Sequence, residues 1–199
     1  ILGNYYITME KDGVEGEGRI FKNSNEALMA YHRREITLHT RIAIPVKSFK
    51  HKVFLDTYKN KYLVTTPGKI IFNEILPDSF PYLNEPTSEN IEGVTPARYF
   101  IDYGKDIKEE IKNMDRAKAF NKGALEKIIA QMFKRYRTTE TSIYLDKLKD
   151  QGFKYSTYAG FTIAYSDIVT SKNKDAIVEE SNKEVKKINK QFQRGLITD

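Results

Sequence analysis

The sequence predicts a mixed α+β fold with short strands, an antiparallel helical pair and a long charged helix near its C-terminal end. Residues 38–46 alternate apolar and polar side chains, which is the period of a half-buried strand. Residues 121–137 repeat apolar side chains at helical spacing. Residues 174–194 are charged around most of a helical surface. These three patterns combine strand and helix signals in one chain and predict the α+β class.

The N-terminal part predicts short elements joined by turns. Residues 1–9 are aromatic and apolar, and they fit either a short helix or a strand. Residues 11–18 form a turn, because three glycines there permit backbone conformations that other residues resist. Residues 19–22 predict a short strand, and Ser24 is predicted to cap a helix over residues 25–34.

The middle of the chain predicts one further strand between irregular segments. Residues 47–61 are polar and rich in Lys, and they predict a hairpin or loop. A second strand is expected over residues 62–66, and the Pro-Gly pair directly after it is expected to end it. Residues 69–76 form a short apolar element, and residues 83–96 predict a loop.

Helices dominate the following stretch. Residues 102–116 have helical character, and residues 121–137 form an amphipathic helix. Residues 139–150 continue as a second helix that packs against the first, and Gly152 is expected to end it. Residues 153–168 then predict a turn followed by a strand or extended segment.

The helix over residues 174–194 has a pattern typical of a helix that pairs with a single partner. Its narrow apolar stripe lies among charges and consists of Ile177, Val178, Val185, Ile188 and Phe192. We expect a partner helix after Asp199 to complete a helical hairpin.

Composition restricts the function classes. The formal net charge is +6 and the isoelectric point about 9.2, which permits contact with nucleic acid but equally suits solvated surface Lys. There is no Cys, which excludes disulfides, Cys-ligated zinc and thiol catalysis and fits a cytoplasmic location. No apolar run approaches the roughly 20 residues of a membrane span.

Motifs for catalysis are missing from the sequence. The three histidines do not form an HExxH pair, and no phosphate-binding glycine loop occurs. Two-metal nucleotidyl transfer needs clustered carboxylates, whereas Asp146 and Asp150 lie among Lys residues on one helix face. The sequence therefore predicts no catalytic, cofactor-binding or metal-binding residues in this chain.

Several stretches, in one fixed order, are similar to a known family. They are ILGNYYITM (1–9), GEGRIF (16–21), EALMAY (26–31), LHTRI (38–42), TTPGKIIFNEILP (65–77), LDKLKDQGFKY (145–155) and QFQRGLITD (191–199). This set resembles the bacterial DNA-directed RNA polymerase beta-prime subunit, the largest catalytic subunit, and the stretch at 65–77 is the most specific match. The chain is expected to be an internal fragment.

The resemblance implies a place in transcription. In that family the corresponding stretch follows the loop that holds the catalytic Mg²⁺, and that loop is not in this chain. The parent is a cytoplasmic nucleotidyltransferase that works with beta, alpha and omega subunits on DNA and RNA. We expect the isolated chain to be inactive, and nucleotide incorporation by the purified chain on a primed template would contradict this.

The resemblance also implies two domains. Residues 1–170 would form a pore domain that walls the secondary channel, the route for nucleoside triphosphates and backtracked RNA. Residues 171–199 would form the truncated first rim helix, also called a funnel helix. Gre-type transcript-cleavage factors would dock on it near Gln193 and Arg194.

Some positions depart from the family pattern. Tyr158 stands where Arg is usual. Thr139 and Asp150 occupy positions where some bacteria use Lys and Tyr to bind an alarmone nucleotide, so that site is not carried over. Residues 47–61 and 87–118 match poorly and are expected to be loops or insertions.

Two other function classes remain open from the residues alone. A free-standing basic module for RNA or ribonucleoprotein would use the net charge and the 12% aromatic content to bind and stack bases. A helical scaffold protein is suggested only by residues 174–194, whose stripe is too short for a self-sufficient coiled coil.

Overall fold

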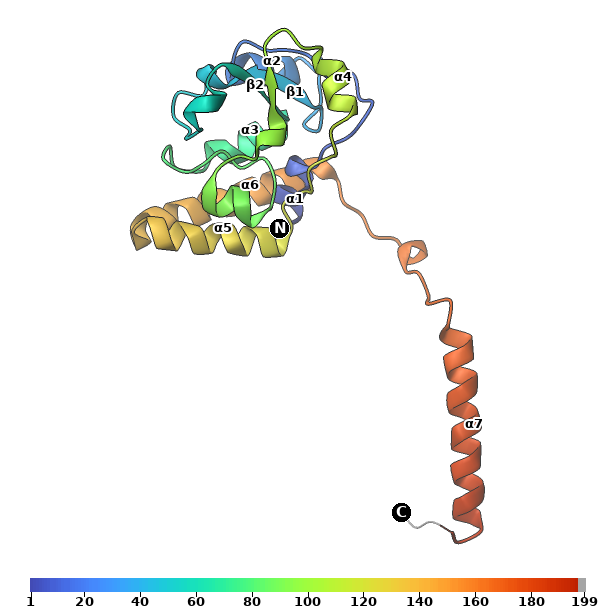
Figure 1. Ribbon diagram of the computed structural model, residues 1–199. Coiled ribbons are helices and arrows are strands. Elements are labelled where there is room, and N and C mark those ends of the chain that lie inside the picture. Colours follow the sequence, from blue (N-terminus) through green and yellow to red (C-terminus); the bar gives the residue numbers. More distant parts are fainter. Residues whose placement is uncertain (197–199) are drawn as a thin grey trace. The chain divides into compact units, whose positions relative to one another are not determined.

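The computed structural model describes residues 1–196, which divide into a unit over Ile1–Gly160 and a second unit that starts at Phe161 (Figure 1). The α+β class is confirmed. The helices are α1 (Leu2–Thr8), α2 (Ser24–His32), α3 (Pro67–Glu74), α4 (Ile107–Lys112), α5 (Lys122–Arg135), α6 (Thr138–Ala159) and α7 (Lys174–Gln193). The strands are β1 (Ile42–Pro45), β2 (Lys61–Thr65) and β3 (Phe100–Asp102).

The strands form one antiparallel sheet in the order β1-β2-β3. Ile42 lies opposite Thr65, and Leu63 lies opposite Phe100. The strand predicted over 62–66 is confirmed with a shift of one residue. The strand predicted over 38–46 is confirmed only in its second half, because the backbone N–H of Thr37 donates to the hydroxyl of Thr40 at 2.9 Å and closes a turn there.

The N-terminal segment forms a helix rather than a strand over its first residues. The strand predicted over 19–22 is wrong, because Ile20 forms only a single bridge to Ala43. Asn23, not Ser24, caps α2, and its side chain accepts from the backbone N–H of Glu26 at 2.9 Å. Asn is as good a cap as Ser, so the helix starts one residue earlier than expected.

The short apolar element at 69–76 is the helix α3. The preceding Pro-Gly pair begins this helix rather than separating it from β2, because Pro suits the first helical turn. The Thr66 hydroxyl accepts from the backbone N–H of Lys69 at 3.2 Å and caps the helix. A Cβ on Gly68 would lie 1.8 Å from the carbonyl oxygen of Ile7, so α3 can approach α1 only with glycine here.

The poorly matching segments are mostly irregular. Residues 47–61 contain 3₁₀ turns at Val46–Ser48 and Asp56–Tyr58, and no hairpin. The predicted loop over 83–96 contains one π-helical turn, Glu89–Gly93. Helical character over 102–116 is confirmed only for α4. The strand β3 was not predicted.

The antiparallel pair α5 and α6 is confirmed (Figure 1). The prediction that Gly152 ends the second helix is wrong, because α6 continues to Ala159 and Gly160 ends it in the left-handed conformation at φ 61°. Over 153–168 a turn followed by a strand or extended segment was predicted, and the turn is wrong because the first seven residues are helical. The described remainder is not a strand but an extended segment with one 3₁₀ turn, Tyr165–Asp167.

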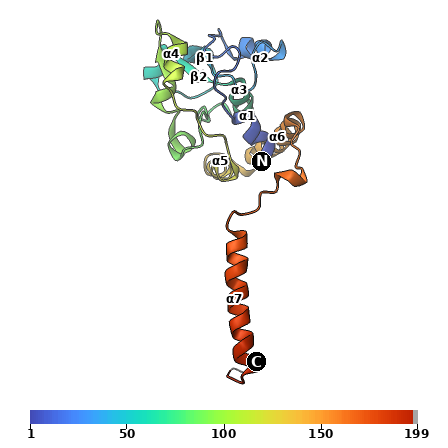
Figure 2. The same ribbon diagram turned by 90° about the vertical axis from the view of Figure 1, so that its right-hand side faces the viewer.

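The first unit has the sheet at one end and the α5–α6 pair at the other, with α1 and α3 between them (Figures 1 and 2). The main apolar core joins these layers. Its fully buried members include Ile7, Phe72, Phe120, Ile128 and Met132. Smaller clusters fill the space between α2 and the sheet and between the sheet and α4.

The second unit consists of an extended segment with one 3₁₀ turn, followed by α7. The helix predicted over 174–194 is confirmed, and Gly195 follows it with φ 67°. Among the helices of residues 1–196, none is long and apolar enough to cross a lipid bilayer.

Candidate functional site

The predicted docking residues lie together at the C-terminal end of α7. Gln193 is the last helical residue, and Arg194 follows it as the C-terminal cap. Both side chains are exposed, and within residues 1–196 neither side chain has a hydrogen bond or an ion pair. The carbonyl ends of a helix favour a cation, so Arg194 is well placed there. The two residues therefore present an open polar tip.

The apolar stripe of α7 is uncovered in the described part of the chain. Its five members are each about half exposed, from 48% for Ile188 to 58% for Ile177. A surface helix normally buries such a stripe against another element. The helix thus has a face suited to a partner.

The candidate groups for metal chemistry do not assemble. Within residues 1–196 there is no group of three or more His, Asp or Glu that could hold a metal ion. His32 and His51 are exposed, whereas His39 is buried beside Met9. Lys149 pairs with both Asp146, at 3.1 Å, and Asp150, at 3.6 Å, which makes these carboxylates part of a charged surface.

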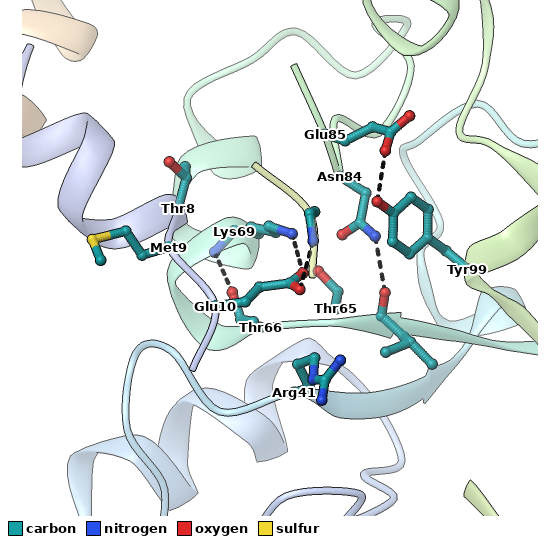
Figure 3. A network of polar contacts seen from close by, with 12 residues as sticks. Thr8, Met9, Glu10, Arg41, Thr65, Thr66, Lys69, Asn84, Glu85 and Tyr99 are labelled. Carbon is teal, nitrogen blue, oxygen red and sulfur yellow. Dashed lines mark hydrogen bonds and ion pairs between the residues drawn. The ribbon is translucent and has the colours of Figure 1, made fainter. Parts of the chain in front are cut away.

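A buried ion pair forms the polar centre of the first unit (Figure 3). Lys69 of α3 is fully buried, and its ammonium group donates to the Glu10 carboxylate that follows α1. The other oxygen of Glu10 accepts from the backbone N–H of Ala117 at 2.9 Å. Burial lowers the pKa of Lys69, while the Glu10 charge opposes that shift. Both partners must be present, because either charge alone would be unpaired in the core.

Two further clusters flank this pair. Arg41 pairs with Asp12 at 2.7 Å and Glu17 at 3.0 Å, which fastens the glycine turn to β1. On the other side, Glu85 accepts from the Tyr99 hydroxyl at 2.6 Å and pairs with Arg98. Burial raises the pKa of Tyr99 to about 12, so it remains a neutral donor. The clusters tie loops to the sheet.

Sequence reasoning did not find this polar centre. Lys69 could have been noticed, since a single cation begins an otherwise apolar stretch inside the most specific family match. Glu10 follows an apolar segment in the same way. Their pairing spans 59 residues of sequence, and no local period reports it.

The three single-residue departures from the family pattern lie on the surface of the first unit. Thr139 and Asp150 are exposed on α6. Tyr158 is 68% exposed near the end of α6, and its ring lies 5.8 Å from that of Tyr155. The structure therefore brings no buried polar group to these positions.

Comparison with known proteins decides the family. The family model for RNA polymerase Rpb1, domain 3, matches residues 1–168. The chain belongs to the RNA polymerase Rpb1 domain 3 family. All 199 residues also align, at 55% identity, with the DNA-directed RNA polymerase subunit beta' of Bacillus licheniformis, and at 54% with that of Geobacillus kaustophilus.

These alignments confirm the beta-prime resemblance over the whole chain. The chain spans 17% of the length of each of these two beta-prime relatives. The Bacillus subtilis subunit is 51% identical over the same 199 residues. The low coverage of the relatives means that this member of the Rpb1 family corresponds to one segment of a much longer subunit.

Proposed function

We propose that the chain works as a structural segment of the beta-prime subunit in a bacterial DNA-dependent RNA polymerase. The observation that carries this proposal is the alignment of all 199 residues with beta-prime subunits. In this role the parent enzyme, with its Mg²⁺ and its beta, alpha and omega subunits, performs nucleotidyl transfer on DNA and RNA. The segment itself supplies a folded wall and an exposed helix.

The geometry of the first unit supports the role of a wall. Its buried charged groups are paired, as in the Arg41 and Glu10 clusters, and a single main apolar core joins its layers. We propose that residues 1–170 line the secondary channel of the parent. Residues 171–199 would begin the first rim helix, with its apolar stripe facing a returning helix.

Purification of the polymerase tests the first part. Peptides of this sequence should be recovered by mass spectrometry from the assembled enzyme, within one long polypeptide and in equal amount to the beta subunit. Recovery of the sequence only as a separate protein outside the polymerase would contradict the proposal. That result would favour the RNA-binding module, although several large aromatic side chains of the first unit, such as Phe72 and Tyr82, are buried in the core and cannot stack on bases.

We further propose that Gre-type factors dock at the tip of α7. Arg194→Glu in the assembled polymerase should weaken factor binding at least about 5-fold, equal to about 1 kcal/mol, because a central interface charge is reversed. Lys174→Glu, the same change at the other end of α7, is the matched control and should leave binding unchanged. Equal affinity of the Arg194→Glu and unchanged enzymes would contradict the docking site.

A further inference from the structure

A cavity in the first unit lies where the end of α2, the segment before β1 and the end of α6 meet. Its volume is about 390 Å³, which is within the range of small-molecule sites. Its chemically distinctive lining residues are Tyr6, Tyr31, Tyr158, His39, Lys11 and Arg34. None of the polar clusters described above uses this cavity.

Arg34 lines the cavity from an unfavourable backbone position. It is the one non-glycine residue with positive φ in the described chain, at 62°. Its backbone N–H donates to the carbonyl of Tyr31 at 2.9 Å, and that of Glu35 donates to Ala30 at 3.0 Å, which is the helix ending that normally selects glycine. A Cβ makes this conformation costly, so Arg here indicates a use for its side chain.

The cavity also has two cations that lack a carboxylate partner. The side chains of Lys11 and Arg34 are exposed, and neither forms an ion pair within residues 1–196. Three of the nearby carboxylates are already engaged: Asp12 and Glu17 pair with Arg41, and Glu35 pairs with Arg19. Glu15 in the same turn has no ion pair among the described residues, so the two cations exceed the unpaired carboxylates by one, which favours an anionic ligand.

His39 supplies a buried acceptor. Its Nδ1 lies 3.2 Å from the carbonyl oxygen of Met9, which fits an Nδ1–H donor and leaves Nε2 as an acceptor. The ring is 3% exposed, and its Nε2 has no hydrogen-bond partner among the described residues. Burial and the Lys11 charge lower the pKa of His39, which keeps the ring neutral. Buried acceptors without a partner are uncommon in folded proteins.

We propose that this cavity binds a nucleoside phosphate. The base would stack on the rings of Tyr31 and Tyr158, and the phosphates would contact Lys11 and Arg34. The His39 ring, which lines the cavity, would contact the edge of the base. A plain inorganic anion would leave the aromatic lining unused, and an apolar ligand would leave both cations unpaired. The site does not depend on the role of the chain as a channel wall.

Photocrosslinking in the assembled polymerase tests this site separately from the catalytic centre. The probe is 8-azidoadenosine triphosphate, and the labelled peptides are mapped by mass spectrometry. We expect label on peptides that contain Tyr31 or Tyr158. Arg34→Gly should reduce this label at least 5-fold, since it removes a phosphate contact. The same substitution relieves the left-handed strain, so it should raise rather than lower the unfolding temperature of the chain.

Arg33→Ala is the matched control, because it removes the same charge from the adjacent residue, which lines a different cavity. It should leave the label unchanged, and excess ATP should abolish the label while inorganic triphosphate should not. The absence of label on both tyrosine peptides would overturn the proposal. Equal label in the Arg34→Gly and Arg33→Ala enzymes, or equal competition by inorganic triphosphate and ATP, would overturn it too.

Discussion

Gly3→Ala should separate α1 from α6 and destabilise the first unit. A Cβ at position 3 would lie 1.9 Å from the carbonyl oxygen of Gly152 and 2.7 Å from the backbone nitrogen of Ser156. Ordinary contact begins at about 3.4 Å, so the helices must move apart by about 1.5 Å. Backbone atoms line both sides of the contact, and no side chain can rotate to make room.

The magnitude follows from what this movement would break. The side-chain amide of Asn4 donates to the carbonyl of Leu148 at 3.0 Å, and its loss leaves buried polar groups worth about 2 kcal/mol. Strained packing around Ile7 costs about 2 kcal/mol more. The better helix propensity of Ala returns about 1 kcal/mol. We therefore expect the free energy of unfolding to fall by about 3 kcal/mol.

Urea unfolding of the chain, followed by far-ultraviolet circular dichroism, measures this change. With a typical dependence on urea, the midpoint should fall by about 1.5 M. Gly93→Ala is the matched control, because a Cβ there meets no atom within 4 Å, and its effect should stay within about 0.5 kcal/mol. A Gly3→Ala chain as stable as the Gly93→Ala chain would refute the close helix contact.

Two further perturbations test the charged groups of the first unit. Lys69→Met should lower the free energy of unfolding by about 3–5 kcal/mol, because it leaves the Glu10 carboxylate buried without its cation. Adding Glu10→Gln to this variant should recover part of the lost stability in the same urea assay. If the double variant is no more stable than Lys69→Met, the pairing is contradicted. Burial lowers the pKa of Lys52 from 10.5 to about 8, so between these values the unfolded chain binds more protons and stability should rise with pH. Lys52→Met should flatten that rise between pH 8 and 10.5 in urea titrations, and an unchanged pH profile would show that Lys52 is not buried.

The sequence predicts best those elements whose pattern is local. The helix α5 has an apolar face repeated over four turns and an Asn cap, so both its type and its start could be read directly. The strand β2 was found for the same reason, because its apolar run ends at a Pro-Gly pair. The helix α7 followed from its charged pattern, whereas the choice of Gln193 and Arg194 at its tip came from the family resemblance together with that exposed helix.

Elements that depend on distant partners were missed. Gly152 indicated a helix end, yet it lies inside α6, where a Cβ would be 2.9 Å from the side-chain nitrogen of Asn4. Glycine lowers the helix propensity at position 152, but it allows α1 and α6 to pack closely, and no local sequence pattern reveals that packing. The strand β3 has three residues and forms only by pairing with β2, and the bond between Glu10 and Lys69 is equally non-local.

The contact between α1 and α6 has a consequence for synthesis on the ribosome. The hydrogen bond from Asn4 to Leu148 joins residues 144 positions apart, so α1 cannot dock until α6 has left the exit tunnel. At bacterial elongation rates of 5–20 residues per second, this delay is on the order of 10 s. During that time the apolar side of α1 is open to chaperones, and a nascent chain released before α6 would keep it exposed.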